Sequence, residues 1–189
     1  MNGSRVKKGL AALLLLGATA CASVAPKYTP LPENVNRLRD AGLEPVKVGA
    51  FTAKPGSEES VNQLSIRGGN YQSPYDGSFV AYLREALRQE LEDARLVDAA
   101  ATCEVGGVLV RNELSTGVDK GTAAIEARFT VTRGGQVRFD KTKSASYEWE
   151  SSFVGAIAIP RSQQNYPTVV QRLLSQLYTD ADFLAALKK

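Results

Sequence analysis

Apolar and polar positions alternate most regularly over residues 122–133, where the odd positions from 123 to 131 are apolar and most even positions are polar. This period of two predicts a strand with one buried face. Gly134 and Gly135 follow and predict a hairpin turn, after which residues 136–150 keep mostly apolar side chains at odd positions. The pattern therefore predicts two long neighbouring strands joined by a tight turn.

Two further strands are predicted at residues 44–53, between Gly42 and Pro55, and at residues 103–114, which contain a Gly106-Gly107 pair. In two other segments the apolar residues recur every three or four positions instead. The first begins after Ser78, a good helix cap, and ends near Ala94, and the second covers residues 167–178. Each segment has one apolar stripe, so both helices are expected to lie on a neighbouring layer.

The predicted order is strand, helix, three strands, helix. Helices with one apolar face and a sheet with one apolar face can each be buried only against the other. We therefore predict the α+β class, as a two-layer sandwich in which an antiparallel sheet of about four strands carries two helices on one face. About 150 residues are enough for one such domain, which we place at residues 43–189.

The first apolar run of the chain has a different character. It covers residues 10–17, follows a short basic region, and leads through the small residues Ala18 to Ala20 to Cys21. A basic start, a short apolar run and small residues are typical of a cleaved signal peptide, here residues 1–20. The run is about half the roughly 20 residues that a membrane-spanning helix needs.

The residues before Cys21 resemble a bacterial lipobox, and this resemblance implies that the Cys21 thiol carries the lipid and becomes the first residue. The same small residues also fit ordinary signal peptidase cleavage. In lipoproteins of bacteria with two membranes, Asp after the cysteine favours the inner membrane, so Ala22 implies the outer membrane, facing the periplasm. Residues 21–42 contain three prolines and are predicted to be a tether.

Charge and composition exclude several functions. Three of the 23 basic residues lie in the signal peptide, which leaves 20 basic against 20 acidic residues, so we expect no nucleic-acid partner. The chain has no histidine, the commonest general base and transition-metal ligand. No catalytic residue, metal or cofactor is therefore expected. Cys103 is predicted to be buried and free, or joined to Cys21 if that residue carries no lipid.

The most unusual candidate site is residues 153–159, an apolar segment without charge between a strand and a helix. It is either a strand or loop folded onto the edge of the core, or an exposed surface for lipid or a protein partner. The contact residues would be Phe153, Val154, Ile157 and Ile159.

Weaker candidates have simpler explanations. Residues 67–70, of sequence Arg-Gly-Gly-Asn, could present amide groups to an anion but also suit a turn. Asp76 lies just before the first helix and suits a cap or turn. Lys141 and Lys143 interrupt the apolar face of the last strand and could meet lipid phosphates or lie at a solvated strand end.

With the lipobox-like Cys21, the prolines after it and this order of elements, the chain resembles the small α/β lipoproteins of the Gram-negative envelope. The nearest pattern is that of YajG-type lipoproteins, and the lipoprotein LptE and auxiliary lipoproteins of ABC-type lipid transporters share the architecture. The resemblance implies a non-catalytic outer-membrane lipoprotein, held by its lipid, whose domain binds an envelope protein or lipid. The alternatives are an accessory lipoprotein of a lipid transporter, or a soluble periplasmic protein with an unrecognised enzymatic site.

Overall fold

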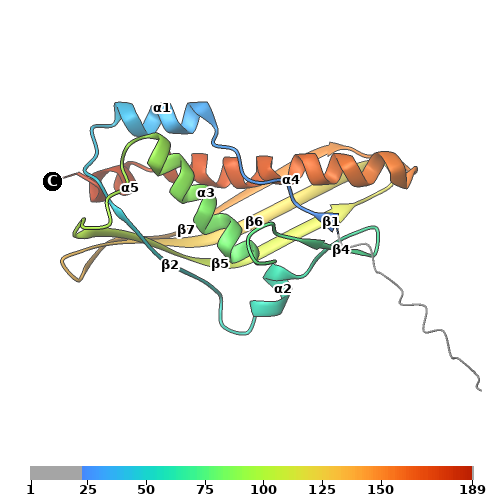
Figure 1. Ribbon diagram of the computed structural model, residues 1–189, viewed down its shortest axis with the longest axis horizontal. Helices are drawn as coiled ribbons and strands as arrows, with labels where there is room; N and C mark the ends of the chain where they lie inside the picture. The colour runs from blue at the N-terminus through green and yellow to red at the C-terminus, as the bar shows by residue number, and fades with distance from the viewer. Residues whose placement is uncertain (1–22, 189) are drawn as a thin grey trace, which may run out of the picture.

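The computed structural model describes residues 23–188, which form two sheets and the helices around them (Figure 1). The strands are β1 (Ser23–Val24), β2 (Lys47–Ala53), β3 (Leu64–Ile66), β4 (Gly69–Gln72), β5 (Cys103–Thr116), β6 (Lys120–Arg133) and β7 (Gln136–Glu150). The helices are α1 (Pro32–Asp40), α2 (Glu58–Asn62), α3 (Phe79–Asp93), α4 (Gly155–Tyr178) and α5 (Ala181–Ala186). The large sheet has the order β2-β5-β6-β7, and the small sheet has the order β1-β4-β3.

The large sheet is built on the predicted alternation. In β6 the odd positions from Ala123 to Val131 are at most 1% exposed, and they face α3 and α4, which cover one side of the sheet (Figure 1). Gly134 and Gly135 form the β6–β7 turn with φ of +56° and +79°, values that glycine adopts without strain. Ser78 caps α3 by accepting from the Ala81 amide at 3.2 Å. The predicted α+β sandwich is confirmed.

One edge of the large sheet differs from the prediction. β2 pairs with β5 in parallel, whereas β5, β6 and β7 are antiparallel to their neighbours. The chain leaves β2, passes through α2, the β3–β4 hairpin and α3, and then returns to start β5 at the same end of the sheet. A connection that crosses over through a helix produces parallel strands, so the sheet is mixed.

The N-terminal segment also differs, because residues 23–42 are packed and are no free tether. β1 pairs with β4 through Ser23 and Tyr71, and Tyr28 is 4% exposed. α1 begins with Pro32 in its first turn, a position where the missing N–H costs nothing, and buries Leu38 against α3 and α4. The prolines fix an extended path without preventing burial. Cys21 and residues 1–20 lie outside the described residues.

The last long helix begins twelve residues before the predicted start at Pro167. Four buried residues spaced by four extend its inner face toward the N-terminus: Ala158, Ser162, Tyr166 and Val170. Pro167 has no N–H to bond the carbonyl of Gln163, and the Tyr71 hydroxyl donates to that carbonyl instead, at 3.4 Å. α4 therefore continues through Pro167, because a tertiary partner satisfies the group that proline leaves open.

The prediction that the apolar odd-numbered residues of β7 share one buried face is wrong near the start of the strand. Val131 pairs with Phe139 and the next residue, Thr132, pairs with Val137, so one extra residue on β7 forms a bulge. Phe139 is 3% exposed, whereas Val137 is 61% exposed. Val137 thus lies on the surface beside the β6–β7 turn.

Candidate interaction surface

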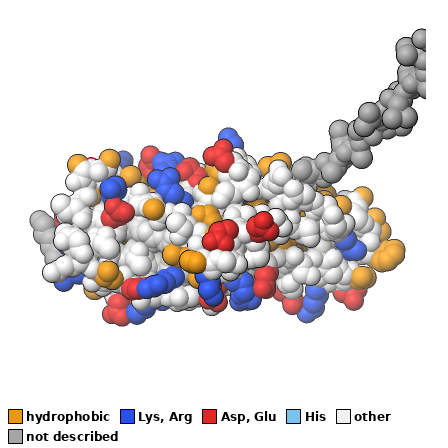
Figure 2. Space-filling view, turned by 90° about the horizontal axis from the view of Figure 1, so that it is seen from below, with side chains coloured by type: hydrophobic (Ala, Val, Ile, Leu, Met, Phe, Trp, Pro, Cys, Tyr) orange, Lys and Arg blue, Asp and Glu red, His pale blue; other side chains and the backbone are white. Residues whose placement is uncertain are grey.

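One end of the molecule carries a group of exposed apolar side chains. Val118, Phe153, Val154 and Ile157, here called the apolar end, are 52%, 79%, 51% and 44% exposed. They come from the β5–β6 turn and from the loop and first turn that lead into α4. The amide of Ser151 donates to the carbonyl of Asp119 at 2.8 Å, which joins these two segments. In Figure 2, hydrophobic side chains gather at the right-hand end of the molecule, where α4 begins in Figure 1.

The structure divides residues 153–159 between the two interpretations that the sequence leaves open. Phe153, Val154 and Ile157 are exposed, whereas Ala158 is fully buried and Ile159 is half-buried against the core. The division follows from the helix that begins at Gly155, because neighbouring residues of a helix point in different directions. Ile159 therefore belongs to the edge of the core, and the other three predicted contact residues belong to the surface.

This division predicts different costs for two similar substitutions. Ile157→Asp should change the free energy of unfolding by less than about 0.5 kcal/mol, as expected for a surface position. Ile159→Asp should lower it by about 1–3 kcal/mol, because the new carboxylate displaces an apolar contact with the core. Urea denaturation followed by circular dichroism compares them, and equal costs would mean that both side chains lie on the same kind of surface.

Arg67 holds the apolar end together. It lies in the turn of the β3–β4 hairpin with φ of +54°, followed by Gly68 with φ of +78°. Its Nη2 donates to the carbonyl of Gly117 at 3.1 Å and to that of Ser152 at 2.6 Å, so one side chain connects the small sheet to both segments of the apolar end. The Arg-Gly-Gly-Asn segment thus forms a hairpin turn, the simpler of the two interpretations.

The first described residue, Ser23, lies toward the apolar end of the molecule. β1 runs parallel to β4, so its first residue lies beside the β3–β4 turn, and Ser23 Oγ donates to the carbonyl of Asn70 at 3.4 Å. Figure 1 places β1 and β4 below the N-terminal half of α4. Cys21, the predicted lipid site, precedes Ser23 by two residues.

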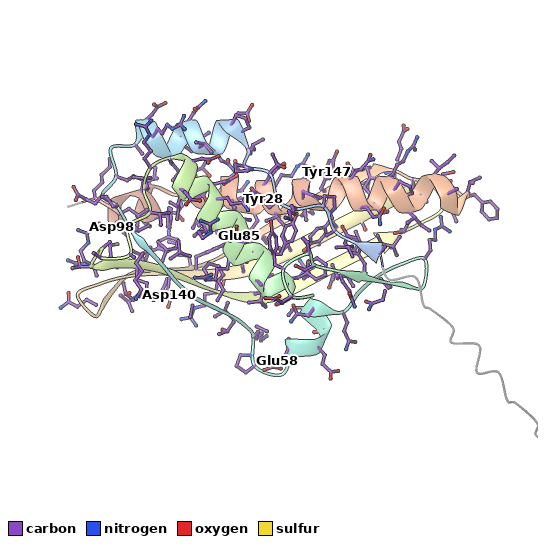
Figure 3. The ribbon with its side chains drawn as sticks, in the orientation of Figure 1. Tyr28, Glu58, Glu85, Asp98, Asp140 and Tyr147 are labelled. Atoms are coloured by element: carbon purple, nitrogen blue, oxygen red, sulfur yellow. The ribbon has the colours of Figure 1, made fainter. Side chains whose placement is uncertain are left out.

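A buried carboxylate fixes the segment that follows β1. Glu90 of α3 is fully buried, and its Oε1 accepts from the Tyr28 hydroxyl at 2.6 Å and from the Leu31 amide at 3.0 Å. The Nδ2 of Asn34 lies 3.2 Å from both carboxylate oxygens and also donates to the carbonyl of Gln171 in α4. Tyr28 lies against α3 in Figure 3. This Glu90 network ties the N-terminal segment to both long helices.

The electrostatics of Glu90 follow from its burial. Burial raises the pKa of the Glu90 carboxyl above its ordinary value, and the hydrogen bonds from Tyr28, Leu31 and Asn34 offset only part of that effect. Burial also raises the pKa of Tyr28, so its hydroxyl stays a donor. The sequence contains a signal for this residue: Glu90 follows Ala86 by four positions and Leu87 by three, which places it on the apolar stripe of α3.

An open hollow of about 520 Å³ lies at the end of the large sheet opposite to the apolar end, beside the β6–β7 turn and α5. It is lined mainly by charged residues of both signs: Arg133, Arg138, Phe139, Asp140, Lys141, Asp182, Ala185, Ala186 and Lys188. Burial raises the pKa of nearby Asp180, but hydrogen bonds from Lys143 and Lys141 outweigh it and hold that pKa well below its ordinary range. The two lysines therefore form ion pairs with the start of α5. The carboxylates of Asp180 and Asp182 compete with any anionic ligand for Lys141.

Three further features of the described residues concern metal ligands, the free thiol and membrane-spanning helices. Within residues 23–188, no three His, Cys, Asp or Glu side chains are placed to hold a metal ion. Cys103 is buried and free in this range, and burial raises the pKa of its thiol, which makes the reactive thiolate less accessible. Over the same range, no helix combines the length and the apolar character that crossing a bilayer requires. The apolar end is distinguished by its four exposed apolar side chains.

The fold belongs to a class with known structures, although the sequence matches no protein-family model and no curated protein. The chain is similar to protein XCC0632 from Xanthomonas campestris, a DUF330 protein, with a TM-score of 0.53 and 14% identity over 84% of this chain and 93% of that chain. A similarity at this identity shows a shared fold.

Two further solved structures are less similar. Protein CT253 from Chlamydia trachomatis has a TM-score of 0.44 and 12% identity over 76% of this chain and 95% of that one. A minor lipoprotein from Acinetobacter baumannii has a TM-score of 0.41 and 10% identity over 72% of this chain and 90% of that one. The specific resemblance to YajG-type lipoproteins stays a prediction.

Proposed function

We propose that this chain is a non-catalytic lipoprotein of the outer membrane, held by a lipid on Cys21, whose periplasmic domain binds an envelope protein or lipid. The observation that carries the proposal is the position of Cys21. It ends a signal-peptide pattern and precedes by two residues a strand that is already part of the folded domain. A lipid at this position would hold the whole domain close to the membrane surface.

The remaining features agree with attachment and binding more readily than with chemistry. The mature chain is close to neutral and lacks histidine, and the buried carboxylate of Glu90 has neutral hydrogen-bond partners that serve to fix the N-terminal segment. The exposed side chains of the apolar end offer contact area without a reactive group. A contiguous apolar surface beside an attachment point is typical of a membrane or protein contact.

The test is Cys21→Ser in the full chain, expressed in a bacterium with two membranes and fed radioactive palmitate. We expect the substitution to abolish labelling and to move the protein from the membrane to the soluble fraction, because the serine cannot carry the thioether-linked lipid. The unsubstituted chain should sediment with the outer membrane in a density gradient.

Cys103→Ala is the matched control, since it removes the other cysteine of the chain, which is buried in the domain. This variant should keep both its label and its membrane fraction. Palmitate labelling that survives Cys21→Ser, or membrane sedimentation that does not change, would contradict the lipid anchor.

A further inference from the structure

Two features that lie far apart in the sequence meet at one end of the molecule. The first is the start of β1, where the chain enters the domain two residues after Cys21. The second is the apolar end, which includes Phe153, the most exposed of the large hydrophobic residues of the described chain. A short series of contacts joins them: Ser23 bonds Asn70 in the β3–β4 hairpin, and Arg67 of the same hairpin bonds Gly117 and Ser152.

The distance from Cys21 limits what can cover the apolar end. Two residues span at most about 7 Å, so a lipid on Cys21 brings the surface of the bilayer to the start of β1. Because the apolar end shares that end of the molecule, the bilayer is the nearest apolar phase available to it. The nearness of the bilayer rests on the proposed lipid anchor.

The chemistry of the apolar end suits the boundary between headgroups and acyl chains. Residues 153–160 contain no charged side chain. The exposed charges nearby are balanced, with three of each sign: Arg67, Lys120, Arg161, Asp119, Glu148 and Glu150. Attraction to the membrane would therefore come from the burial of apolar side chains and depend little on anionic lipids or salt.

We propose that the apolar end inserts into the bilayer interface beside the lipid of Cys21. The domain is then held at two points, a covalent acyl anchor and the side chains of Phe153, Val154, Ile157 and Val118. This second contact sets the orientation of the domain, since a single covalent attachment point leaves the domain free to tilt. The occupant of the surface is the bilayer rather than a protein partner.

The experiment places a tryptophan at the apolar end and measures its depth. Phe153→Trp is made in the full, lipidated chain, which is reconstituted into vesicles of phosphatidylethanolamine and phosphatidylglycerol with brominated acyl chains. Bromine quenches tryptophan that reaches the acyl region, so fluorescence of the added residue should fall by roughly half, as expected for a side chain about 5–10 Å below the headgroup surface. The unsubstituted chain, with its single Trp149, gives the background.

Val137→Trp is the matched control. Val137 is 61% exposed but lies beside the β6–β7 turn, at the opposite end of the sheet. We expect brominated lipids to leave the added fluorescence of this variant unchanged. Both substitutions replace exposed side chains, and equal thermal unfolding midpoints will verify that both variants fold.

The outcomes separate insertion from anchoring. If Phe153→Trp is not quenched while the labelled protein still floats with the vesicles, insertion is wrong and the anchor stands. Equal quenching of both tryptophans would also overturn the proposal, because it would mean that the domain lies flat or has no fixed orientation. If the chain takes up no palmitate and does not float, the anchor is wrong and the insertion is wrong with it.

Discussion

Replacing Glu90 with alanine should lower the free energy of unfolding by about 3–5 kcal/mol, because each buried donor that loses its acceptor costs about 1–3 kcal/mol. Three donors depend on this carboxylate: the hydroxyl of Tyr28, the amide of Leu31 and the side-chain amide of Asn34. They all belong to the N-terminal segment, so the loss should release that segment first. Urea denaturation gives the size of the effect, and amide hydrogen exchange over residues 28–38 gives its place.

Glu92→Ala is the control on the same helix. The Glu92 side chain is 56% exposed and pairs only with Arg88 among the described ion pairs, one helical turn earlier. Such a surface pair contributes about 0.3–0.5 kcal/mol, so its removal should be close to the limit of measurement. A Glu90→Ala variant no less stable than Glu92→Ala would show that the Glu90 network does not hold the segment.

Glu90→Gln tests the sign of the pKa shift. Burial raises the pKa of Glu90 in the folded state above its ordinary value of 4.5, so folding favours the protonated carboxyl. The stabilisation from this proton is complete below the unfolded pKa and is lost as the pH rises through the folded pKa. Glutamine does not titrate. The stability of the unsubstituted chain relative to Glu90→Gln should therefore fall as the pH rises, and an increase would mean that the hydrogen bonds outweigh burial.

Tyr166→Ala should also lower the free energy of unfolding by about 3–5 kcal/mol, the usual cost of removing a large buried side chain. The ring of Tyr166 lies 5.0 Å from that of Phe79, 5.6 Å from that of Tyr82 and 5.8 Å from that of Tyr71, measured between centroids. This aromatic cluster joins α3, α4 and the small sheet. Thermal and urea unfolding measure the loss.

Tyr166→Phe separates the ring from its hydroxyl. The hydroxyl donates to Oδ1 of Asn112 at 3.0 Å, and Nδ2 of Asn112 donates to the carbonyl of Val61 at 2.9 Å. Removing the hydroxyl leaves a buried amide oxygen without this donor and should cost about 1–3 kcal/mol. If Tyr166→Ala and Tyr166→Phe were both nearly neutral, Tyr166 could not lie in the core, and α4 could not run through Pro167 as described.

The elements that the sequence predicts well are those with a local and strong period. β6 alternates over its whole length, and α3 has both a capping serine and one apolar stripe, so neighbouring residues alone determine their type. β2 has the sequence pattern of a strand, but this pattern does not predict which strand β2 pairs with or in which direction. The parallel pairing with β5 depends on the crossover connection between the two strands. This is why the sheet is mixed where the sequence predicts an antiparallel one.

The failures near the prolines have a second physical cause. In the first half of α4 the buried face is made partly of Ala158, which is small, and Ser162, which is polar, so the sequence shows no apolar stripe there. Pro160 and Pro167 then suggest a boundary that a tertiary hydrogen bond from Tyr71 removes. The packing of the N-terminal segment is missed for a similar reason. It depends on hydrogen bonds to Glu90, which lies about sixty positions later in the chain.

The candidate site is predicted in part by its composition. An uncharged apolar segment between a strand and a helix is unusual, and the sequence identifies Phe153, Val154 and Ile157 on that basis. The sequence does not show that Ile159 differs from these three residues. Its direction toward the core is set by the helix that begins at Gly155, and the sequence does not predict this start. The nearness of this segment to the start of β1 has no local signal, since it depends on hydrogen bonds of Ser23 and Arg67.

The length of β6 and β7 determines how far the β6–β7 turn lies from the apolar end. β6 and β7 have 14 and 15 residues, and at about 3.3 Å per residue they extend for roughly 45 Å. With the apolar end in the bilayer and the strands along the membrane normal, the β6–β7 turn and the charged hollow beside it would stand near that height above the lipid. A partner that uses the hollow would then have to reach down to this level, and shortening both strands equally would lower its docking position without altering either end.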